Sequence, residues 1–213
     1  MCCFNFYKNK MSKEKSKLTD TIDTKIIDGF YAGSLLVSTP DILDPRFNRS
    51  VIYLISHNDK GAMGFIINKP IEGIYLSDII RVNGSPKKID TNKNNIVLFG
   101  GPVEYNNGFL LHSKEYQIKN TTLKINEHFS LTNDTKAISD VYKGKGPVSS
   151  LFMLGYAGWS PGQLEKEIME DSWLVANADP ELVFNNSFSD KYNLSLEVLG
   201  IENAFFSSSS GKA

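Results

Sequence analysis

The chain has 213 residues, of which 41% are hydrophobic and 22% are charged, and its formal net charge is −1. This is the composition of one globular domain with a sizeable core. The chain lacks the basic excess that nucleic-acid-binding proteins use to neutralise phosphates. No stretch approaches the ~20 apolar residues that cross a bilayer. The sequence therefore argues against binding to nucleic acid and against insertion into a membrane.

The two ends of the chain have the composition of disordered tails. Residues 1–24 are polar and rich in lysine, residues 207–213 are a serine-rich run, and the domain is expected over 25–206. A conventional polar start at Met11 predicts that translation begins there. Cys2 and Cys3 are adjacent and build neither a disulfide framework nor a metal site. Because no signal sequence is recognisable either, the sequence favours a cytoplasmic protein.

Short apolar runs bounded by turn residues predict the strands. In chain order they cover 35–37, 51–55, 64–67, 96–99, 108–112, 121–125, 151–155 and 173–175. The segment from His57 to Gly61 joins the second and third runs, and it predicts a hairpin in which Gly61 adopts a positive φ. The run 151–155 predicts a central strand, and the polar stretch 83–95 predicts a flexible connection.

Capping residues and helical periodicity predict four helices. They cover 76–81, a segment from Thr132 or Asn133 to about Tyr142, a segment from Ser160 to about Glu170, and a segment from Ser187 or Ser189 to Gly200. In the third helix, Ser160 at the N-cap, Pro161 at the first position and Gln163 at the third form a capping box. In the last helix, Tyr192 faces the core. Strands and helices alternate irregularly, which predicts an α+β fold.

The most specific segment is Gly155–Glu165, a dense mixture of glycine, aromatic residues and a Gln/Glu pair. Together with further blocks in the same order over about 30–200, it resembles the YqgE/AlgH family of bacterial proteins. Those blocks are Gly33–Pro40, Asp44–Phe47 with Ser50 and Val51, His57 with Gly61–Gly64, Asn68–Pro70, Gly100–Val103, and Leu111 with His112. One departure is Tyr192, where the family pattern has tryptophan, and no functional consequence is expected from it.

The resemblance implies a fold rather than an activity. The expected fold is a single compact α+β domain with a bent, coiled mixed sheet and a few flanking helices. No established enzyme activity follows from the resemblance. Members of the family carry the label of transcriptional regulator through an association with alginate production, and that label gives no molecular mechanism.

His57 and His112 each end a predicted strand. A catalytic histidine needs a partner that fixes its tautomer, and Asp59 follows closely after His57. The simpler interpretation is a histidine that caps the turn. The two histidines can meet only if their strands are neighbours. Because the spacing of a metal site is absent, no metal, no cofactor and no catalytic residue is predicted.

Arginine is rare in this chain, with three residues against 20 lysines, and Arg46 and Arg49 lie in one loop. These arginines are candidates for binding an anion through the planar guanidinium, or for pinning the loop by ion pairs. Trp159, Gln163 and Glu165 surround a helix start, which suits a small polar or anionic ligand. The alternative for that corner is a hydrophobic staple with a capping box.

Several polar loops begin where an apolar strand ends. If these strand ends share one edge of the sheet, five side chains converge on one groove: Arg46, Arg49, His57, Asn68 and Trp159. With Gln163 and Glu165 they form the predicted ligand site. The sequence therefore favours a non-enzymatic protein that binds a small ligand or a protein partner and has a regulatory role. Two alternatives stay open: a transcriptional regulator that contacts DNA, despite the lack of a helix-turn-helix pattern, and a hydrolase-like enzyme that uses His57 or His112.

Overall fold

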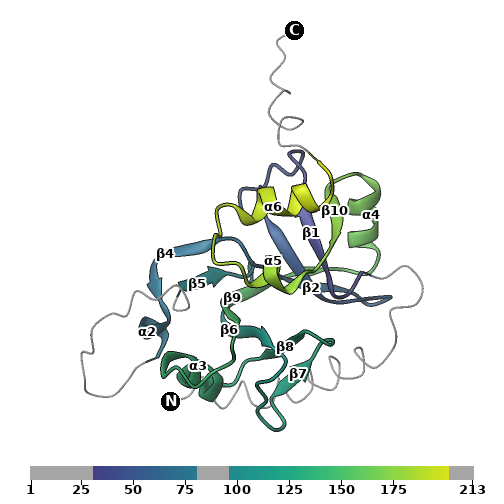
Figure 1. Ribbon diagram of the computed structural model, residues 1–213. Helices are drawn as coiled ribbons and strands as arrows, with labels where there is room; N and C mark the ends of the chain where they lie inside the picture. Colours follow the sequence, from purple (N-terminus) through teal and green to yellow (C-terminus); the bar gives the residue numbers. More distant parts are fainter. Residues whose placement is uncertain (1–30, 81–95, 202–213) are drawn as a thin grey trace.

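The computed structural model describes residues 31–80 and 96–201 (Figure 1). Its strands are β1 (Ser34–Ser38), β2 (Val51–Asn58), β3 (Gly61–Ile66), β4 (Pro70–Tyr75), β5 (Ile96–Phe99), β6 (Val103–Ser113), β7 (Thr122–Lys124), β8 (Phe129–Thr132), β9 (Ser150–Trp159) and β10 (Trp173–Asn177). Its helices are α2 (Leu76–Ile79), α3 (Thr135–Tyr142), α4 (Gln163–Met169), α5 (Pro180–Phe184) and α6 (Lys191–Val198). Strands and helices alternate irregularly along the chain, in agreement with the predicted α+β fold.

The described strands form one mixed sheet. Their order is β10-β1-β2-β3-β9-β6-β8-β7, and β4 pairs with β5, which pairs with β9. The β5–β9 pair is parallel, whereas β9 runs antiparallel to both β3 and β6. The prediction of a central strand is confirmed, because β9 has three neighbouring strands. Each of the eight predicted segments overlaps a strand, although Ile67, Thr121 and Ile125 lie just outside β3 and β7, and the structure adds β4 and β8.

The predicted hairpin between β2 and β3 is also confirmed. Asn58 lies opposite Gly61 in the antiparallel register, so that the turn itself consists of Asp59 and Lys60. Gly61 has a φ of 123°, and the side chain of Asn58 accepts a hydrogen bond from the backbone N–H of Lys60 at 2.8 Å. The turn is therefore fixed by a glycine conformation together with a local side-chain bond.

The sheet bends where β9 passes from one half of the molecule to the other. Residues 157–159 of β9 pair with β3, and residues 150–156 pair with β6. At the register shift between β9 and β6, Gly155 has a φ of 71°, and a Cβ atom at this position would collide with the carbonyl oxygen of Gly101. Glycine is required here because two backbone segments meet without room for a side chain. The bent sheet expected from the resemblance is thus observed.

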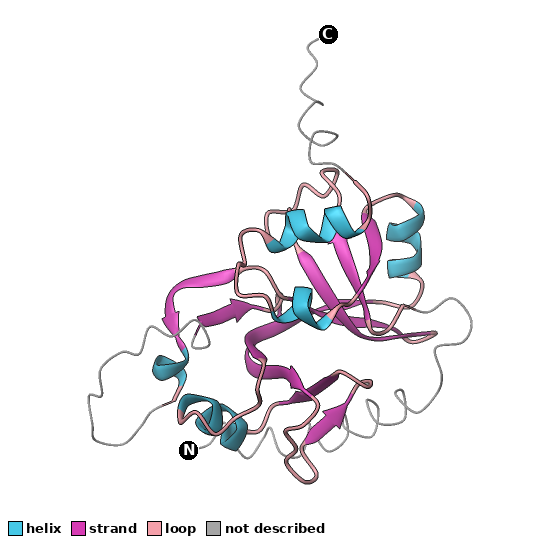
Figure 2. Cartoon of the chain, viewed as in Figure 1, coloured by secondary structure: helices cyan, strands magenta, loops and turns pink. Residues whose placement is uncertain are grey.

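Figure 2 shows the curled sheet and the helices that pack against it. The sheet encloses one hydrophobic cluster, and two more lie on its reverse side. Tyr53 of β2 and Met153 of β9 contribute to the enclosed cluster, which α5 and α6 close. The reverse face of β2 contributes Leu54 to a second cluster beside α4. The reverse face of β9 contributes Phe152 to a third cluster, beneath α3. Both faces of the central strands are buried, which explains why they read as continuous apolar runs.

Several helix boundaries differ from the prediction. Helix α4 begins at Gln163 rather than Pro161, because Gly162 adopts a left-handed conformation with a φ of 75°. Half of the predicted capping box forms nevertheless, since the backbone N–H of Ser160 donates to the Gln163 side chain at 3.0 Å. The N-cap of α3 is Asp134, not Thr132 or Asn133. Helix α6 begins at Lys191, after the predicted serine caps.

Helix α5 was not predicted, although its N-cap Asp179 and the following proline are ordinary start signals. Its five residues are too few to show a helical period. The predicted tails, Met11, the two cysteines and the 83–95 connection lie outside the described residues. None of the described helices is long and apolar enough to cross a membrane.

Candidate functional site

The structure separates the predicted ligand residues into two groups. Arg49 precedes β2 and lies over the ring of Tyr192, on the side of the enclosed core. Trp159 belongs to the cluster on the reverse face of the sheet, and His57 lies near the far end of β2. The path along β2 from Val51 to His57 measures roughly 20 Å at the usual rise per residue. The hypothesis of a single groove is therefore wrong.

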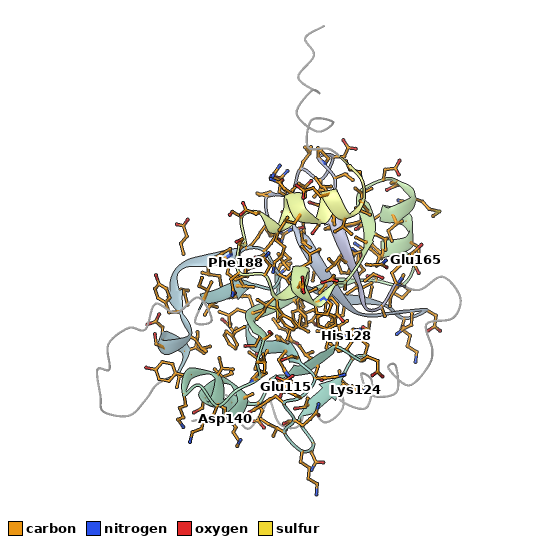
Figure 3. All side chains as sticks on the ribbon, in the orientation of Figure 1. Glu115, Lys124, His128, Asp140, Glu165 and Phe188 are labelled. Atoms are coloured by element: carbon orange, nitrogen blue, oxygen red, sulfur yellow. The ribbon has the colours of Figure 1, made fainter. Side chains whose placement is uncertain are left out.

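In Figure 3, Glu165 of α4 lies at the right of the molecule, and Phe188, which precedes α6 and lines the pocket described below, lies left of its centre. Arg46 belongs to neither group, because it does not line the pocket and its guanidinium pairs with Asp44. Its guanidinium binds both carboxylate oxygens of Asp44, with the shortest distance at 2.6 Å. This pair accounts for the loop-pinning interpretation of Arg46, and it holds the pKa of Asp44 down at about 2.

His57 forms an internal pair with Glu165. The backbone N–H of Tyr31 donates to His57 Nδ1 at 3.1 Å, so the neutral ring carries its proton on Nε2. That nitrogen lies 3.1 Å from Glu165 Oε1, and the His57 side chain is fully buried. The carboxylate partner is thus Glu165 rather than the predicted Asp59. The pair links the end of β2 to α4.

Glu167 ties together the remaining residues of this group. Its Oε2 accepts hydrogen bonds from the indole N–H groups of Trp159 and Trp173, each at 2.8 Å. Its Oε1 accepts a third bond, from the side-chain amide of Gln163, also at 2.8 Å. The polar side chains of this group, His57, Trp159, Gln163, Glu165 and Glu167, bind one another. We therefore assign to them the structural role of joining α4 to the sheet. Sequence reasoning gave Glu167 no role, although buried indole N–H groups require an acceptor.

The arrangement of the histidines offers little support for hydrolase chemistry. Strands β3 and β9 lie between β2 and β6, so His57 and His112 are not on neighbouring strands. His112 is fully buried, its Nδ1 lies 2.8 Å from the Ser113 carbonyl, and burial lowers its pKa. Among the described residues, no group of three His, Cys, Asp or Glu side chains could hold a metal ion.

A groove of about 570 Å³ contains a histidine, a carboxylate and a hydroxyl, but not in a catalytic arrangement. His128, Glu115 and Ser113 line it together with residues of α5. The Ser113 hydroxyl donates to Glu115 Oε1 at 2.7 Å, so it is directed at a carboxylate rather than at a histidine base. The groove contains neither His57 nor His112, the two histidines on which the hydrolase alternative depended.

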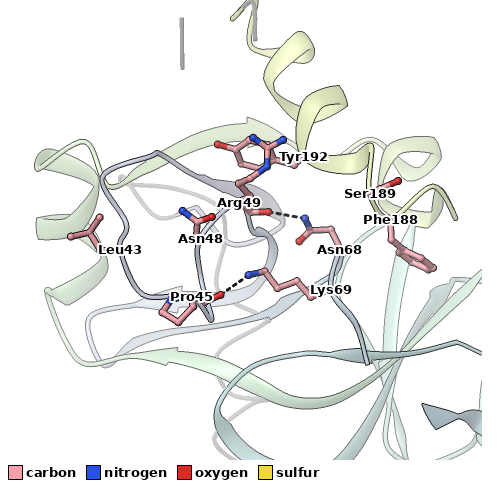
Figure 4. A pocket seen from close by; sticks show the side chains of 9 residues that line it. All are labelled: Leu43, Pro45, Asn48, Arg49, Asn68, Lys69, Phe188, Ser189 and Tyr192. Atoms are coloured by element: carbon pink, nitrogen blue, oxygen red, sulfur yellow. Dashed lines mark hydrogen bonds between the residues drawn. The ribbon is translucent and has the colours of Figure 1, made fainter. Parts of the chain in front are cut away.

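The other group of predicted residues lines a pocket of about 420 Å³ (Figure 4), called here the Arg49 pocket. It lies between the loop before β2, the turn after β3 and the start of α6. Its lining residues are Leu43, Pro45, Asn48, Arg49, Asn68, Lys69, Phe188, Ser189 and Tyr192. Arg49 and Asn68 were predicted ligand residues. Tyr192 is the departure from the family pattern, and the structure places it in the candidate site, where no role was expected.

Asn68 fixes the backbone of Arg49. Its amide nitrogen donates to the Arg49 carbonyl at 2.9 Å, and its amide oxygen accepts from the Val51 N–H at 2.8 Å. Between these two bonds, Arg49 has a φ of 51°, a conformation that is uncommon for residues other than glycine. Such backbone strain persists where neighbouring groups over-determine the conformation. The buried side chain of Asn68 is that neighbour.

The Arg49 guanidinium is positioned by α6. It lies 4.4 Å from the centre of the Tyr192 ring, and one of its terminal nitrogens donates to the Asn193 side chain at 2.9 Å. The Tyr192 hydroxyl donates to the carbonyl of Ser38 at 2.7 Å, which holds the ring against β1. The Arg49 guanidinium thus packs against an aromatic ring that is itself held in place.

Lys69 brings a second positive charge to the pocket. Its ammonium group donates to the carbonyl of Pro45 at 2.9 Å. Burial lowers the pKa of Lys69, and the nearby carboxylate of Asp44 opposes that shift. Arg49 and Lys69 therefore face the same space, and none of the lining side chains is acidic.

A buried lysine lies behind this pocket. Lys191 is fully buried, and its amine donates to the carbonyls of Ile67 at 3.1 Å and Val183 at 2.7 Å. Burial lowers the pKa of Lys191 to about 7. A neutral amine has two N–H donors, which matches the two carbonyls. The bonds join α6 to α5 and to the segment that carries Asn68 and Lys69.

Comparisons of sequence agree on one family. The AlgH-like family model matches residues 35–204. A UPF0301 protein of Bradyrhizobium sp. is 40% identical over 96% of this chain and 97% of the relative. A UPF0301 protein of Ruegeria pomeroyi is 41% identical over 85% of this chain and 98% of the relative. None of these names states a reaction, a ligand or a partner.

Solved structures show the same fold. The solution structure of the AlgH protein from Pseudomonas aeruginosa has a TM-score of 0.70 and 30% identity, covering 89% of this chain and all of that one. The crystal structure of a protein from Corynebacterium diphtheriae has a TM-score of 0.60 at 21% identity, covering 78% of this chain and 87% of that one. By the extent of the sequence match and the likeness to AlgH, this chain belongs to the YqgE/AlgH family.

Proposed function

We propose that this protein binds a small anionic ligand in the Arg49 pocket. The observation that carries the proposal is the joint presence of Arg49 and Lys69 in a lining without acidic side chains. Arginine and lysine pair with carboxylates and phosphates through charge-assisted hydrogen bonds. The side-chain amide of Asn48 adds a neutral donor at the rim, because it has two N–H groups and the contact with the Ile42 carbonyl uses one of them. The charge and hydrogen-bonding capacity of these side chains suit an anion better than a neutral or cationic ligand.

The pocket is organised before any ligand arrives. Asn68 holds the backbone of Arg49, and Tyr192 and Asn193 hold its guanidinium. A preorganised cation loses little conformational entropy on binding. The lining contains neither a histidine nor a carboxylate to serve as a general base. This chemistry supports binding over acid–base catalysis.

We further infer a cytoplasmic location and a regulatory role. The use of cysteine supports the first inference, because Cys2 and Cys3 are the cysteines of the sequence and lie at one end. The regulatory role follows from the proposed mode of action, since a ligand that is bound without turnover can act as a signal by stabilising the state that binds it.

Thermal denaturation in the presence of small anions tests the proposal. Phosphate, citrate, succinate and organic monophosphates are added singly to the full chain. A ligand present at 100 times its Kd stabilises the folded protein by about 2.7 kcal/mol, which raises the Tm by several degrees. The rise is expected to disappear in Arg49→Gln and to persist in Lys124→Gln, whose exposed lysine on β7 lies outside the pocket lining. If no anion gives an increase that depends on Arg49, the proposal is wrong.

A further inference from the structure

We propose that the ligand of the Arg49 pocket is a small organic phosphate monoester, an inference that rests on the anion-binding function proposed above. Three observations lead to this class. They are the number of positive groups, the part of the guanidinium that remains exposed, and the size and apolar edge of the pocket.

The charge balance favours a dianion. Arg49 and Lys69 contribute two positive groups to one lining. No acidic side chain is part of the lining. Of the two acidic residues next to it in the sequence, Asp44 is paired with Arg46, whereas Asp190 accepts a hydrogen bond from the neutral Ser189 hydroxyl at 3.2 Å and keeps its charge. A phosphate monoester carries close to two negative charges at neutral pH, and it therefore matches the two cations better than a single carboxylate does.

The geometry of Arg49 favours a ligand with more than two anionic oxygens. Tyr192 covers one face of the guanidinium, and Asn193 engages one terminal nitrogen. The remaining donors of the fork can bind two oxygens side by side. A carboxylate uses both of its oxygens in that contact, whereas a phosphate monoester keeps a third terminal oxygen for Lys69.

The size of the pocket favours an organic group on the phosphate. A volume of about 420 Å³ lies within the range of pockets that hold small organic molecules. Leu43, Pro45 and Phe188 supply apolar lining. The Leu43 side chain is 89% exposed. An apolar portion of the ligand would cover this side chain and remove it from water.

Titration calorimetry with matched probes tests this class on the full chain. The probes are phenyl phosphate, phenyl sulfate, inorganic phosphate and succinate at pH 7.5. Phenyl sulfate has the shape of phenyl phosphate with one charge fewer, and inorganic phosphate lacks the organic group. We expect phenyl phosphate to bind about tenfold more tightly than each of the others, since one hydrogen bond to a charged group accounts for such a factor.

Variants locate the binding. Arg49→Gln is expected to abolish the heat of phenyl phosphate binding, and Lys69→Met to weaken binding about tenfold. Lys124→Gln, which removes an exposed cation of β7 outside the pocket lining, is expected to leave binding unchanged. Circular dichroism and the Tm of each variant show that it is folded. If Lys69→Met is poorly folded, the comparison of phenyl phosphate with phenyl sulfate on the native chain still measures the preference for a dianion.

The outcomes separate the two proposals. If succinate binds through Arg49 and the phosphates do not, the anion site stands and the phosphate class is overturned. If inorganic phosphate binds as tightly as phenyl phosphate, the organic group is overturned. If phenyl sulfate equals phenyl phosphate, the requirement for a dianion is overturned. If no probe binds and no anion stabilises the protein, both proposals fail.

Discussion

The side-chain amide of Asn68 bridges the carbonyl of Arg49 and the N–H of Val51. One neutral side chain thereby sets the left-handed backbone from which the Arg49 guanidinium reaches Tyr192. The strained residue and the residue that holds it both line the pocket. This relationship links the conformation of the loop before β2 to the position of the group that we propose binds the anion.

Asn68→Ala removes both bonds and leaves the buried N–H of Val51 without its acceptor. We expect the free energy of unfolding to fall by about 2 kcal/mol, measured by urea denaturation. Asn48→Ala is the matched control, because the Asn48 amide makes a longer bond of 3.3 Å on an exposed loop. Equal effects of the two substitutions would show that Asn68 does not hold the loop.

Arg49→Gly and Arg49→Val both delete the guanidinium but differ in the backbone they tolerate. Glycine adopts a positive φ readily, whereas a β-branched residue is strained there. The glycine variant is expected to be more stable than the valine variant by about 1–2 kcal/mol, and neither is expected to bind phenyl phosphate. Equal unfolding free energies would contradict the strain at this position.

Lys191→Met tests the buried amine through pH. The pKa of Lys191 falls from 10.5 in the unfolded chain to about 7 in the folded protein. Between these values the unfolded state binds a proton that the folded state does not, so stability rises with pH by about 1 kcal/mol per unit. Below pH 7 both states are protonated, and the folded protein bears the full cost of the buried charge.

The methionine variant removes this titration. Urea denaturation of both proteins at pH 7, 8 and 9 measures the difference in unfolding free energy. The native protein is expected to gain about 2 kcal/mol relative to Lys191→Met over this interval. Tyrosines such as Tyr53, whose pKa burial raises, titrate above it. A difference that stays constant from pH 7 to 9 would show that Lys191 is charged in the folded state.

Glu167→Ala leaves two buried indole N–H groups without an acceptor, and the expected loss of stability is about 2–4 kcal/mol. The chain has two tryptophans, and both bind Glu167. Intrinsic fluorescence therefore reports on this cluster alone, and we expect a shifted emission maximum in the variant. Glu170→Ala is the control, since Glu170 makes an exposed ion pair with Lys166 at 3.7 Å. An unchanged spectrum in Glu167→Ala would exclude the shared acceptor.

Local patterns determined much of the fold. Apolar runs predicted every described strand except β4 and β8. The hairpin was predicted from Gly61 and its polar neighbours. These features depend on residues close in sequence, whose periodicity and turn geometry are set by local sterics. The start of α4 was misplaced because Gly162 adopts a left-handed conformation, which no capping pattern reveals. Strands β4 and β8 were missed for different reasons. In β4 the residues do not alternate regularly, whereas Phe129–Thr132 of β8 does alternate but spans only four residues, the shortest run that carries the signal.

The sequence by itself determined the family, the strands and the candidacy of Arg49 and Asn68. The tertiary structure decided which candidates share a site. Arg49 meets Tyr192 across the fold because α6 packs on β1 and β2. His57 lies near the other end of β2, and Trp159 belongs to β9 and to the cluster on the reverse face of the sheet. The bend at Gly155 and the alternation of side chains along β2 assign each residue to a face. Such assignments depend on contacts between residues distant in sequence, and local propensity does not encode them.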